Sequence, residues 1–180
     1  MSEIKRVLFV CSGNFYRSRL AEILFNEAAE KLGMDWEAES RGLLKTGELK
    51  GMSDHVVTYL RDHELSHLAV EPRDPLLLDV EDITAFDLIV GLCREEHEPI
   101  INKKYLSLAR AMVKAGRLRY WRIYDIPAPP PVLVRLLGGG HGGPSQPPAS
   151  GTEHIAFAVR DLLKELSGGF TPGNLRPHNH

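Results

Sequence analysis

Cys11 and Arg17 are separated by five residues, and Ser18 follows the arginine directly. A cysteine thiolate is a nucleophile, and an arginine guanidinium can donate two parallel hydrogen bonds to oxygens of one phosphate group. A helix N-terminus and a neighbouring cation both favour the thiolate form of a cysteine. The Ser18 hydroxyl is close enough in sequence to donate a hydrogen bond to the sulfur. This pattern predicts phosphoryl transfer to Cys11, followed by attack of water on a cysteinyl-phosphate.

The residues after Cys11 are predicted to form a phosphate-binding loop. A loop that leaves a strand and enters a helix turns backbone N–H groups inward, and the helix N-terminus adds a partial positive charge. Gly13 offers a position that can adopt a positive φ and lets the backbone approach a ligand. The predicted phosphate-binding residues are Ser12, Gly13, Asn14, Phe15, Tyr16, Arg17 and Ser18.

Such a loop requires a buried strand before it and a helix after it. The run 6–10 is mainly apolar and β-branched, which is typical of a strand buried on both faces of a parallel sheet. From Leu20 onward, apolar residues recur at helical spacing until Gly33 ends the pattern. Strand, tight turn and helix therefore follow in the required order.

The rest of the chain alternates strands with helices. Further strands are predicted at 36–40, 86–92 and 118–124, and further helices at 53–63, at 95–115 with a break at Pro99, and at 152–166. This alternation predicts an α/β three-layer sandwich with a four-stranded parallel sheet. Ligands of such sheets bind beyond the carboxyl ends of the strands, where Cys11 is expected.

One folded domain is expected at 1–168, because a chain of 180 residues suits a single core. The segment from about 127 to 151 is rich in proline and glycine, and it is predicted to be a loop or disordered insertion. Residues 169–180 are predicted to be a flexible tail.

Composition argues against several classes of function. A net charge of -2 is not that of a nucleic-acid-binding domain, and the apolar stretch 7–10 is too short for a signal peptide or a membrane span. We therefore expect a cytoplasmic protein with neither nucleic acid nor membrane as a partner. Two cysteines are too few for a four-cysteine zinc site, and the eight histidines show no convincing ligand spacing. No metal and no cofactor are predicted.

The run from Val10 to Ser18, continued by Leu20-Ala21-Glu22, resembles the signature of low-molecular-weight protein-tyrosine phosphatases. Ser40-Arg41-Gly42 resembles the Ser-Ala-Gly that follows the second strand of that family, and 86–92 resembles its third strand. The resemblance covers 7–124 and the last helix. It implies a metal-free reaction on a phosphotyrosine protein or a small aryl phosphate, with inorganic phosphate or other oxyanions also binding in the loop. It further implies that Asn14 braces the loop through hydrogen bonds.

Two positions depart from the family pattern. Tyr16 stands where the family usually has a small or aliphatic residue, often a second cysteine, and Arg19 replaces a common proline. Without the second thiol a protective disulfide cannot form, so Cys11 is expected to over-oxidise more readily.

The general acid has two candidate alignments. In the family, an aspartate directly before a proline, on the loop after the fourth strand, protonates the leaving tyrosyl oxygen. Asp125 fits this role if one extra residue precedes the proline, whereas matching Ala128-Pro129 to the Asp-Pro pair leaves no acid. We predict Asp125, because it is the only carboxylate in that loop. The alternative is that Asp125 merely caps a turn before Pro127.

Two other functions compete with phosphatase activity. Thioredoxin-coupled arsenate reductases share this fold and loop, and Leu92-Cys93 resembles their second redox position. Their disulfide relay needs a third cysteine that this chain does not have. The other alternative is a catalytically weak module that binds phosphorylated proteins and recruits a partner through Pro129-Pro130-Pro131.

Overall fold

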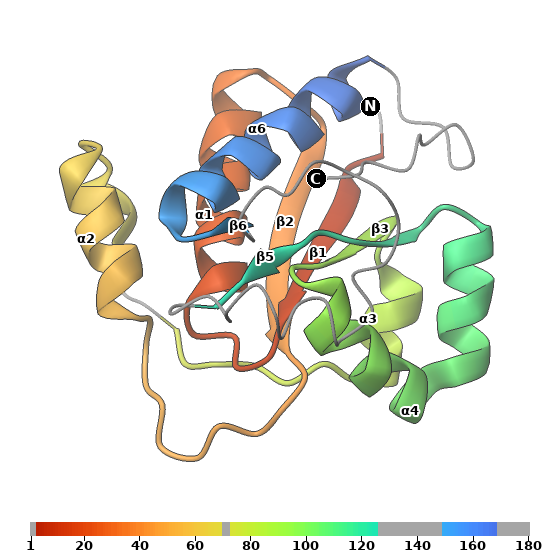
Figure 1. Ribbon diagram of the computed structural model, residues 1–180. Helices are drawn as coiled ribbons and strands as arrows, with labels where there is room; N and C mark the ends of the chain where they lie inside the picture. The colour runs from red at the N-terminus through yellow and green to blue at the C-terminus, as the bar shows by residue number, and fades with distance from the viewer. Residues whose placement is uncertain (1–2, 70–72, 126–148, 169–180) are drawn as a thin grey trace.

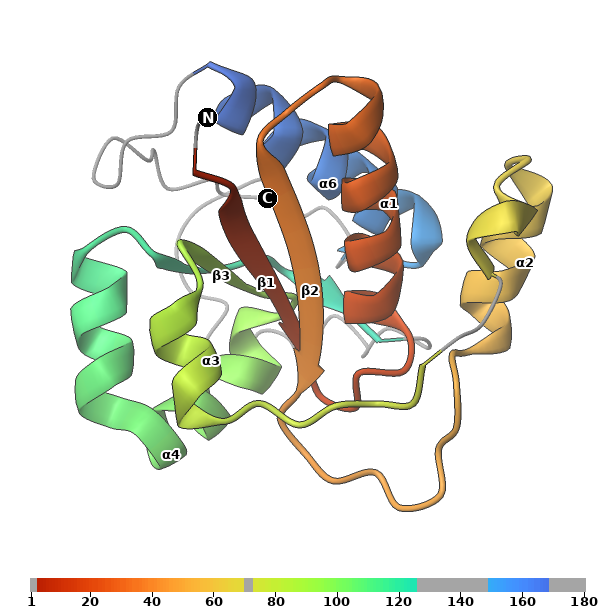
Figure 2. The same ribbon diagram turned by 180° about the vertical axis from the view of Figure 1, so that it is seen from behind.

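The computed structural model describes residues 3–69, 73–125 and 149–168. Its elements are β1 (Lys5–Cys11), α1 (Arg17–Lys31), β2 (Trp36–Gly42), α2 (Asp54–Asp62), the 3-10 helix η1 (Ser66–Ala69), α3 (Val80–Ala85), β3 (Leu88–Gly91), α4 (Arg94–Lys114), β4 (Leu118–Tyr120), β5 (Ile123–Tyr124), β6 (Ala149–Ser150) and α6 (Thr152–Ser167). Four parallel strands form one sheet in the order β2-β1-β3-β4 (Figures 1 and 2). The predicted fold class is therefore confirmed.

Helices cover both faces of this sheet. α1 and α6 lie on one face, and α3 and α4 lie on the other (Figures 1 and 2). Along β1, Val7 and Phe9 pack with the first pair of helices, whereas Leu8 and Val10 pack with the second. All four side chains are completely buried. Burial on both faces explains why the β1 sequence is continuously apolar and does not alternate.

The carboxyl ends of the strands meet at one edge of the sheet. β1 ends at Cys11 and pairs with β3, which ends at Gly91. The β1–α1 loop and the start of α4 therefore lie beside each other at this edge (Figure 1). The topology brings residues near 11–17, 91–97 and 121–125 together, although they are far apart in the sequence.

The strand predicted at 118–124 is two elements. β4 lies in the main sheet, and the chain then leaves the sheet, so that β5 pairs in parallel with β6. After Gly91 the β3 chain turns into α4, so residues beyond Tyr120 have no neighbouring strand in the sheet. β6 also falls inside the segment predicted as a loop at about 127–151. The rest of that segment up to 148 and the predicted tail 169–180 lie outside the described residues.

Two helix predictions also need correction. Short α3 was not predicted, although Asp79 and Asp82 form a capping box at its start. A helix of 6 residues is too short to show a helical repeat of apolar residues. The break predicted at Pro99 is wrong, because α4 continues through it and distorts at Tyr105 (φ -138°, ψ 34°). Within the described residues, no helix is both long enough and apolar enough to span a membrane.

Candidate active site

The predicted phosphate-binding loop joins β1 to α1. Cys11 is the last residue of β1, and Arg17 is the first residue of α1. Tyr16 occupies the N-cap position of α1, but its side chain makes no capping hydrogen bond. The amide groups at the start of the helix are therefore available to an anion, which the helix dipole attracts.

Two hydrogen-bond donors approach the sulfur of Cys11. The Asn14 backbone N–H lies 3.2 Å from Cys11 Sγ, and the Ser18 hydroxyl lies 3.0 Å from it. Ser18 Oγ also accepts a hydrogen bond from Asn14 Nδ2 at 3.0 Å, so its own hydrogen is free to point at the sulfur. Both donors are placed to stabilise negative charge that develops on the sulfur.

Asn14 holds the loop in shape. The positive φ of the loop falls on Asn14 (φ 52°) and not on Gly13, which was the expected position. Asn14 Nδ2 donates to Ser18 and, at 2.7 Å, to Ser40 Oγ. Asn14 Oδ1 accepts from the backbone of Leu76 at 2.9 Å. These bonds satisfy a completely buried amide and hold an unusual backbone conformation in place.

β2 approaches the loop closely. A Cβ atom added to Gly42 would lie 3.0 Å from the carbonyl carbon of Gly13 and 3.1 Å from the backbone nitrogen of Asn14. Only glycine fits there without displacing the loop. The Ser40-Arg41-Gly42 sequence therefore supplies both a hydrogen-bond acceptor and the space that the loop needs.

Arg73 is a loop partner that the sequence analysis missed. Its Nη1 donates to Asn14 Oδ1 at 2.9 Å, and its Nη2 donates to Glu22 Oε2 at 2.9 Å and to Ser40 Oγ at 3.0 Å. Glu22 also pairs with Arg19 at 3.0 Å. Arg73 thus links Asn14 to α1 and β2, and no motif in the sequence marks it.

The guanidinium of Arg17 is fixed from several sides. Its side chain is only 2% exposed, Nη1 donates to the carbonyl of Ile123 at 3.1 Å, and Nη2 lies 2.8 Å from Glu96 Oε2. Burial alone lowers the pKa of Arg17, but the hydrogen bond to Glu96 and the nearby negative groups outweigh it, so that the pKa is raised. Arg17 is therefore a permanently charged group held in one orientation.

His97 contacts both the loop, at Ser12, and the Arg17 partner Glu96. The Cys93 backbone N–H donates to His97 Nδ1 at 3.0 Å, so the ring hydrogen is on Nε2. Nε2 lies 3.4 Å from Ser12 Oγ and 3.6 Å from Glu96 Oε2. Burial, reinforced by the charge of Arg17, lowers the pKa of His97 to about 3, which keeps the ring neutral. No pattern in the sequence marks Glu96 or His97 as part of the site.

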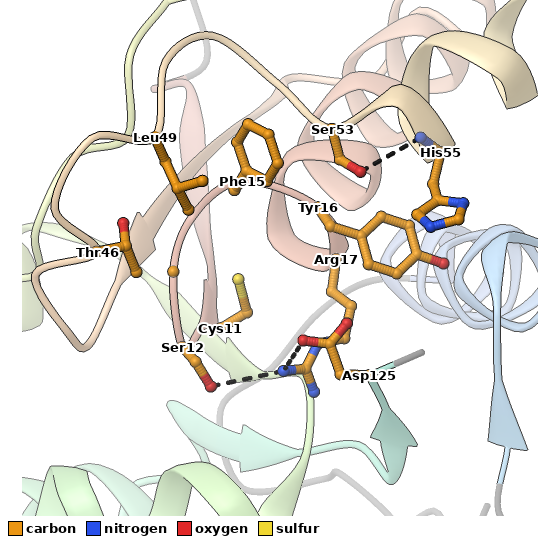
Figure 3. A pocket seen from close by; sticks show the side chains of 11 residues that line it. Cys11, Ser12, Phe15, Tyr16, Arg17, Thr46, Leu49, Ser53, His55 and Asp125 are labelled. Carbon is orange, nitrogen blue, oxygen red and sulfur yellow. Dashed lines mark hydrogen bonds and ion pairs between the residues drawn. The ribbon is translucent and has the colours of Figure 1, made fainter. Parts of the chain in front are cut away.

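The predicted site residues meet at one pocket of about 280 Å³ (Figure 3). Those that line it are Cys11, Ser12, Gly13, Phe15, Tyr16, Arg17 and Asp125. Asn14 and Ser18 are completely buried and do not line the pocket. Asp125 Oδ2 lies 3.3 Å from Arg17 Nη2, and the aspartate side chain is 59% exposed. Ala128, the other position considered for the general acid, lies outside the described residues.

Aromatic and aliphatic side chains form much of the pocket wall. Phe15, Tyr16 and Leu49 line it together with His55, whose ring centroid is 5.5 Å from that of Tyr16. Burial, with the negative charge of Asp125, raises the pKa of Tyr16 to about 12, so its hydroxyl stays neutral. The walls suit a flat apolar group attached to the phosphate.

Cys93 differs from Cys11. It is completely buried, its Sγ lies 3.6 Å from Glu95 Oε2, and burial together with the charge of Glu96 raises its pKa to about 12. Thiol–disulfide exchange requires a thiolate, which this environment disfavours. Among the described residues, no group of three or more histidine, cysteine, aspartate or glutamate side chains is placed to hold a metal ion.

Comparisons with known proteins agree with the motif. Residues 6–124 match the family model for low molecular weight phosphotyrosine protein phosphatase. A protein-arginine-phosphatase of Bacillus subtilis is 26% identical over 161 residues, which cover 89% of this chain and 90% of the relative. Arsenate reductase 1 of Staphylococcus haemolyticus is 29% identical over 91 residues, which cover 51% of this chain and 61% of the reductase.

Solved structures show the same fold. A low-molecular-weight protein-tyrosine phosphatase from T. tengcongensis has a TM-score of 0.54 at 24% identity, with 92% of this chain and 99% of that chain covered. A phosphatase of the same type from Vibrio cholerae O395 has a TM-score of 0.60 at 20% identity, with 92% and 99% covered. At these identities the likeness concerns the fold.

We predict that Arg73→Met weakens anion binding. The substitution removes a charged donor from Asn14 Oδ1, and a hydrogen bond to a charged group contributes about 1.5–3 kcal/mol. The competitive inhibition constant of inorganic phosphate should therefore rise roughly tenfold or more. Arg61→Met is the matched control, because the Arg61 side chain is 65% exposed on α2. An unchanged constant in Arg73→Met would show that Asn14 holds the loop without Arg73.

We predict that the free energy of unfolding of His97→Gln falls less steeply than that of the wild type as the pH is lowered. Below pH 6.5 the unfolded chain protonates this histidine, whereas the folded chain, in which its pKa is about 3, does not. The free energy of unfolding therefore falls by about 1.4 kcal/mol per pH unit from this residue as the pH drops from 6.5 towards 3. Urea unfolding between pH 7 and pH 4.5 measures the slope, with His67→Gln, 62% exposed, as the matched control. Equal slopes for His97→Gln and the wild type would contradict a neutral buried His97.

Proposed function

The chain belongs to the low-molecular-weight phosphotyrosine protein phosphatase family, and we propose that it hydrolyses phosphotyrosine and related aryl phosphate monoesters through a cysteinyl-phosphate. One observation carries the proposal: Cys11 and the fixed guanidinium of Arg17 line the same pocket, whose walls include aromatic side chains. The other features of the site support the individual steps of this reaction.

In the first step the phosphate of the substrate binds to the inward amides of the loop and to Arg17. The Cys11 thiolate attacks the phosphorus in line with the ester oxygen, so that a sulfur–phosphorus bond forms and the oxygen–phosphorus bond breaks. Asp125, in its protonated form, gives its proton to the leaving phenolate oxygen. Asp125 lines the same pocket as Cys11, and its carboxyl group lies beside the guanidinium of Arg17 (Figure 3).

In the second step water attacks the phosphorus of the cysteinyl-phosphate. Asp125, now ionised, accepts a proton from that water, and the sulfur leaves as a thiolate. The donors at 3.0 Å (Ser18) and 3.2 Å (Asn14) stabilise the negative sulfur both before attack and after release. The products are inorganic phosphate and the free phenol, and the enzyme returns to its starting state.

Aryl phosphates fit the pocket better than phosphoarginine, which the name of one relative raises as a substrate. A guanidinium leaving group calls for acidic partners, yet Asp125 is the one carboxylate among the described residues that line the pocket. Phe15, Tyr16 and Leu49 instead offer apolar surface to an aromatic ring. These walls favour phosphotyrosine.

Arsenate reduction fits the chain less well. A disulfide relay needs a partner thiol that can reach the nucleophile as a thiolate and a further thiol to complete the cycle. Cys93 is buried with a raised pKa, and the sequence contains no third cysteine.

A parallel assay of wild type on a phosphotyrosine peptide, a phosphoarginine peptide and arsenate tests the proposal. We expect the phosphotyrosine peptide to be turned over with the highest kcat/KM. Cys11→Ser should abolish turnover without changing the far-UV circular dichroism, because an alcohol is a far poorer nucleophile than a thiolate. Arg17→Lys should be nearly as inactive, since lysine cannot hold two phosphate oxygens at once. Preference for phosphoarginine, or activity retained in Cys11→Ser, would refute the proposal.

Asp125→Asn should lower phosphotyrosine turnover by a factor of 10² or more, because a positioned general acid contributes roughly 10²- to 10⁴-fold. The loss should be smaller for 4-nitrophenyl phosphate, whose leaving group needs less help from a proton. The measurement is the dependence of kcat on leaving-group pKa, which should become steep in the variant. If kcat of the wild type already depends steeply on leaving-group pKa and Asp125→Asn does not change that dependence, Asp125 is not the general acid. The Ala128 alignment then holds, and Ala128→Asp should raise the phosphotyrosine rate.

A further inference from the structure

A second pocket, of about 240 Å³, adjoins the catalytic pocket. Thr46 and Leu49 line both pockets, so one layer of side chains separates them. We call the second one the leucine pocket, because Leu44, Leu49, Leu76 and Leu77 line it. These leucines are 46%, 38%, 44% and 49% exposed, respectively. A cluster of large exposed apolar side chains around a hollow is typical of a binding surface.

One wall of the leucine pocket is attached to the phosphate-binding loop. This wall is the segment 43–53 between β2 and α2, and backbone hydrogen bonds join both of its ends to the loop. The bonds run from the N–H of Leu43 to Cys11 O (3.0 Å), of Leu44 to Ser12 O (2.9 Å) and of Ser53 to Phe15 O (2.9 Å). Thr46 also packs directly on the loop, because a Cβ added to Gly13 would lie 3.0 Å from Thr46 Cγ2. The position of this wall is therefore coupled to the catalytic cysteine.

The opposite wall is the segment 74–77, which runs beside the first at the same end of the molecule (Figure 2). Leu76 donates its N–H to Asn14 Oδ1 at 2.9 Å, and its carbonyl accepts from the N–H of Gly42 at 2.7 Å. Asp74 accepts from the N–H of Gly51 at 3.0 Å and from Lys50 Nζ at 3.1 Å. The Asp74 bonds join the two walls to each other, and the Leu76 bonds attach the second wall to Asn14 of the loop and to Gly42 of β2.

The lining of the pocket favours an apolar occupant. Lys50 and Asp74 neutralise each other at the rim, and the leucine side chains and Pro75 supply the apolar surface. Lys45 is the remaining charged lining residue, and it is exposed. An aliphatic side chain gains from this surface, whereas a charged side chain would lose hydration there without a buried partner.

We propose that the leucine pocket binds an aliphatic side chain that flanks phosphotyrosine in a polypeptide substrate. The inference rests on the proposed function and narrows its substrate from aryl phosphates in general to phosphorylated polypeptides. Residues of an extended chain advance by about 3.3 Å each, so a neighbour of the phosphotyrosine passes over the shared wall at Leu49. A small aryl phosphate ends inside the catalytic pocket and leaves the leucine pocket empty. The extra contact therefore raises kcat/KM for peptides alone.

The test uses a set of phosphotyrosine peptides in which a single leucine is moved from three residues before the phosphotyrosine to three residues after it, with alanine at the other positions. We expect one position of leucine to raise kcat/KM roughly tenfold over the all-alanine peptide, the effect of partly burying one aliphatic side chain. Leu77→Ser should remove that gain. It should leave turnover of 4-nitrophenyl phosphate within twofold. Leu106→Ser is the matched control, because Leu106 is 45% exposed on α4 and lines neither pocket.

Four outcomes would overturn the inference. Equal kcat/KM for all peptides, together with normal turnover of 4-nitrophenyl phosphate, would mean that the proposed function holds but the leucine pocket does not bind substrate. If leucine in the peptide raises kcat/KM for Leu77→Ser as much as for the wild type, the flanking side chain binds elsewhere. If Leu77→Ser instead converts a dimer to a monomer in analytical ultracentrifugation and leaves peptide kinetics unchanged, the pocket binds a second copy of the chain. Failure to hydrolyse any aryl phosphate would refute the proposed function, and the inference with it.

Discussion

A buried positive charge is the constraint on which the site depends. Arg17 is 2% exposed, and transferring an unpaired guanidinium from water into a protein interior costs several kcal/mol. Glu96 from α4 and the Ile123 carbonyl from β5 offset that cost together. These partners come from separate parts of the chain, so the strand order of the sheet must be right before the charge can be buried. The phosphate of a substrate then meets a cation whose orientation was fixed during folding, which is the arrangement that lowers reorganisation during catalysis.

The backbone of the loop depends on a second network, centred on Asn14. Its left-handed conformation turns one amide towards Cys11, and its side chain joins the loop to Ser18, Ser40, Leu76 and Arg73. The segment that follows Arg73 also forms a wall of the leucine pocket, so the loop and that pocket share the same supporting segment. In both networks a neutral amide or imidazole orients charged groups without adding a competing charge to the site.

Local signals in the sequence were sufficient for the fold class and for placing the predicted loop between β1 and α1. Cys11, Arg17 and Ser18 lie within eight consecutive residues, and the buried strand that precedes them is continuously apolar. Partners that act across the fold left no such signal. Arg73, Glu96 and His97 are ordinary polar residues in the sequence, and only the pairing of β1 with β3 and the path of 73–79 bring them to the loop. β6 and the break between β4 and β5 were missed for the same reason, because a two-residue strand is defined by its distant partner and not by its own pattern.

The central claim is that the phosphoryl group passes through the sulfur of Cys11. The most direct measurement mixes the enzyme rapidly with a phosphotyrosine peptide, stops the reaction with a denaturing quench and locates the phosphoryl group by mass spectrometry. The account predicts a phosphoryl group on the Cys11 sulfur within one turnover and none on Cys93. Release of inorganic phosphate without any adduct on Cys11 at the earliest times, while Cys11→Ser still turns over substrate, would contradict it.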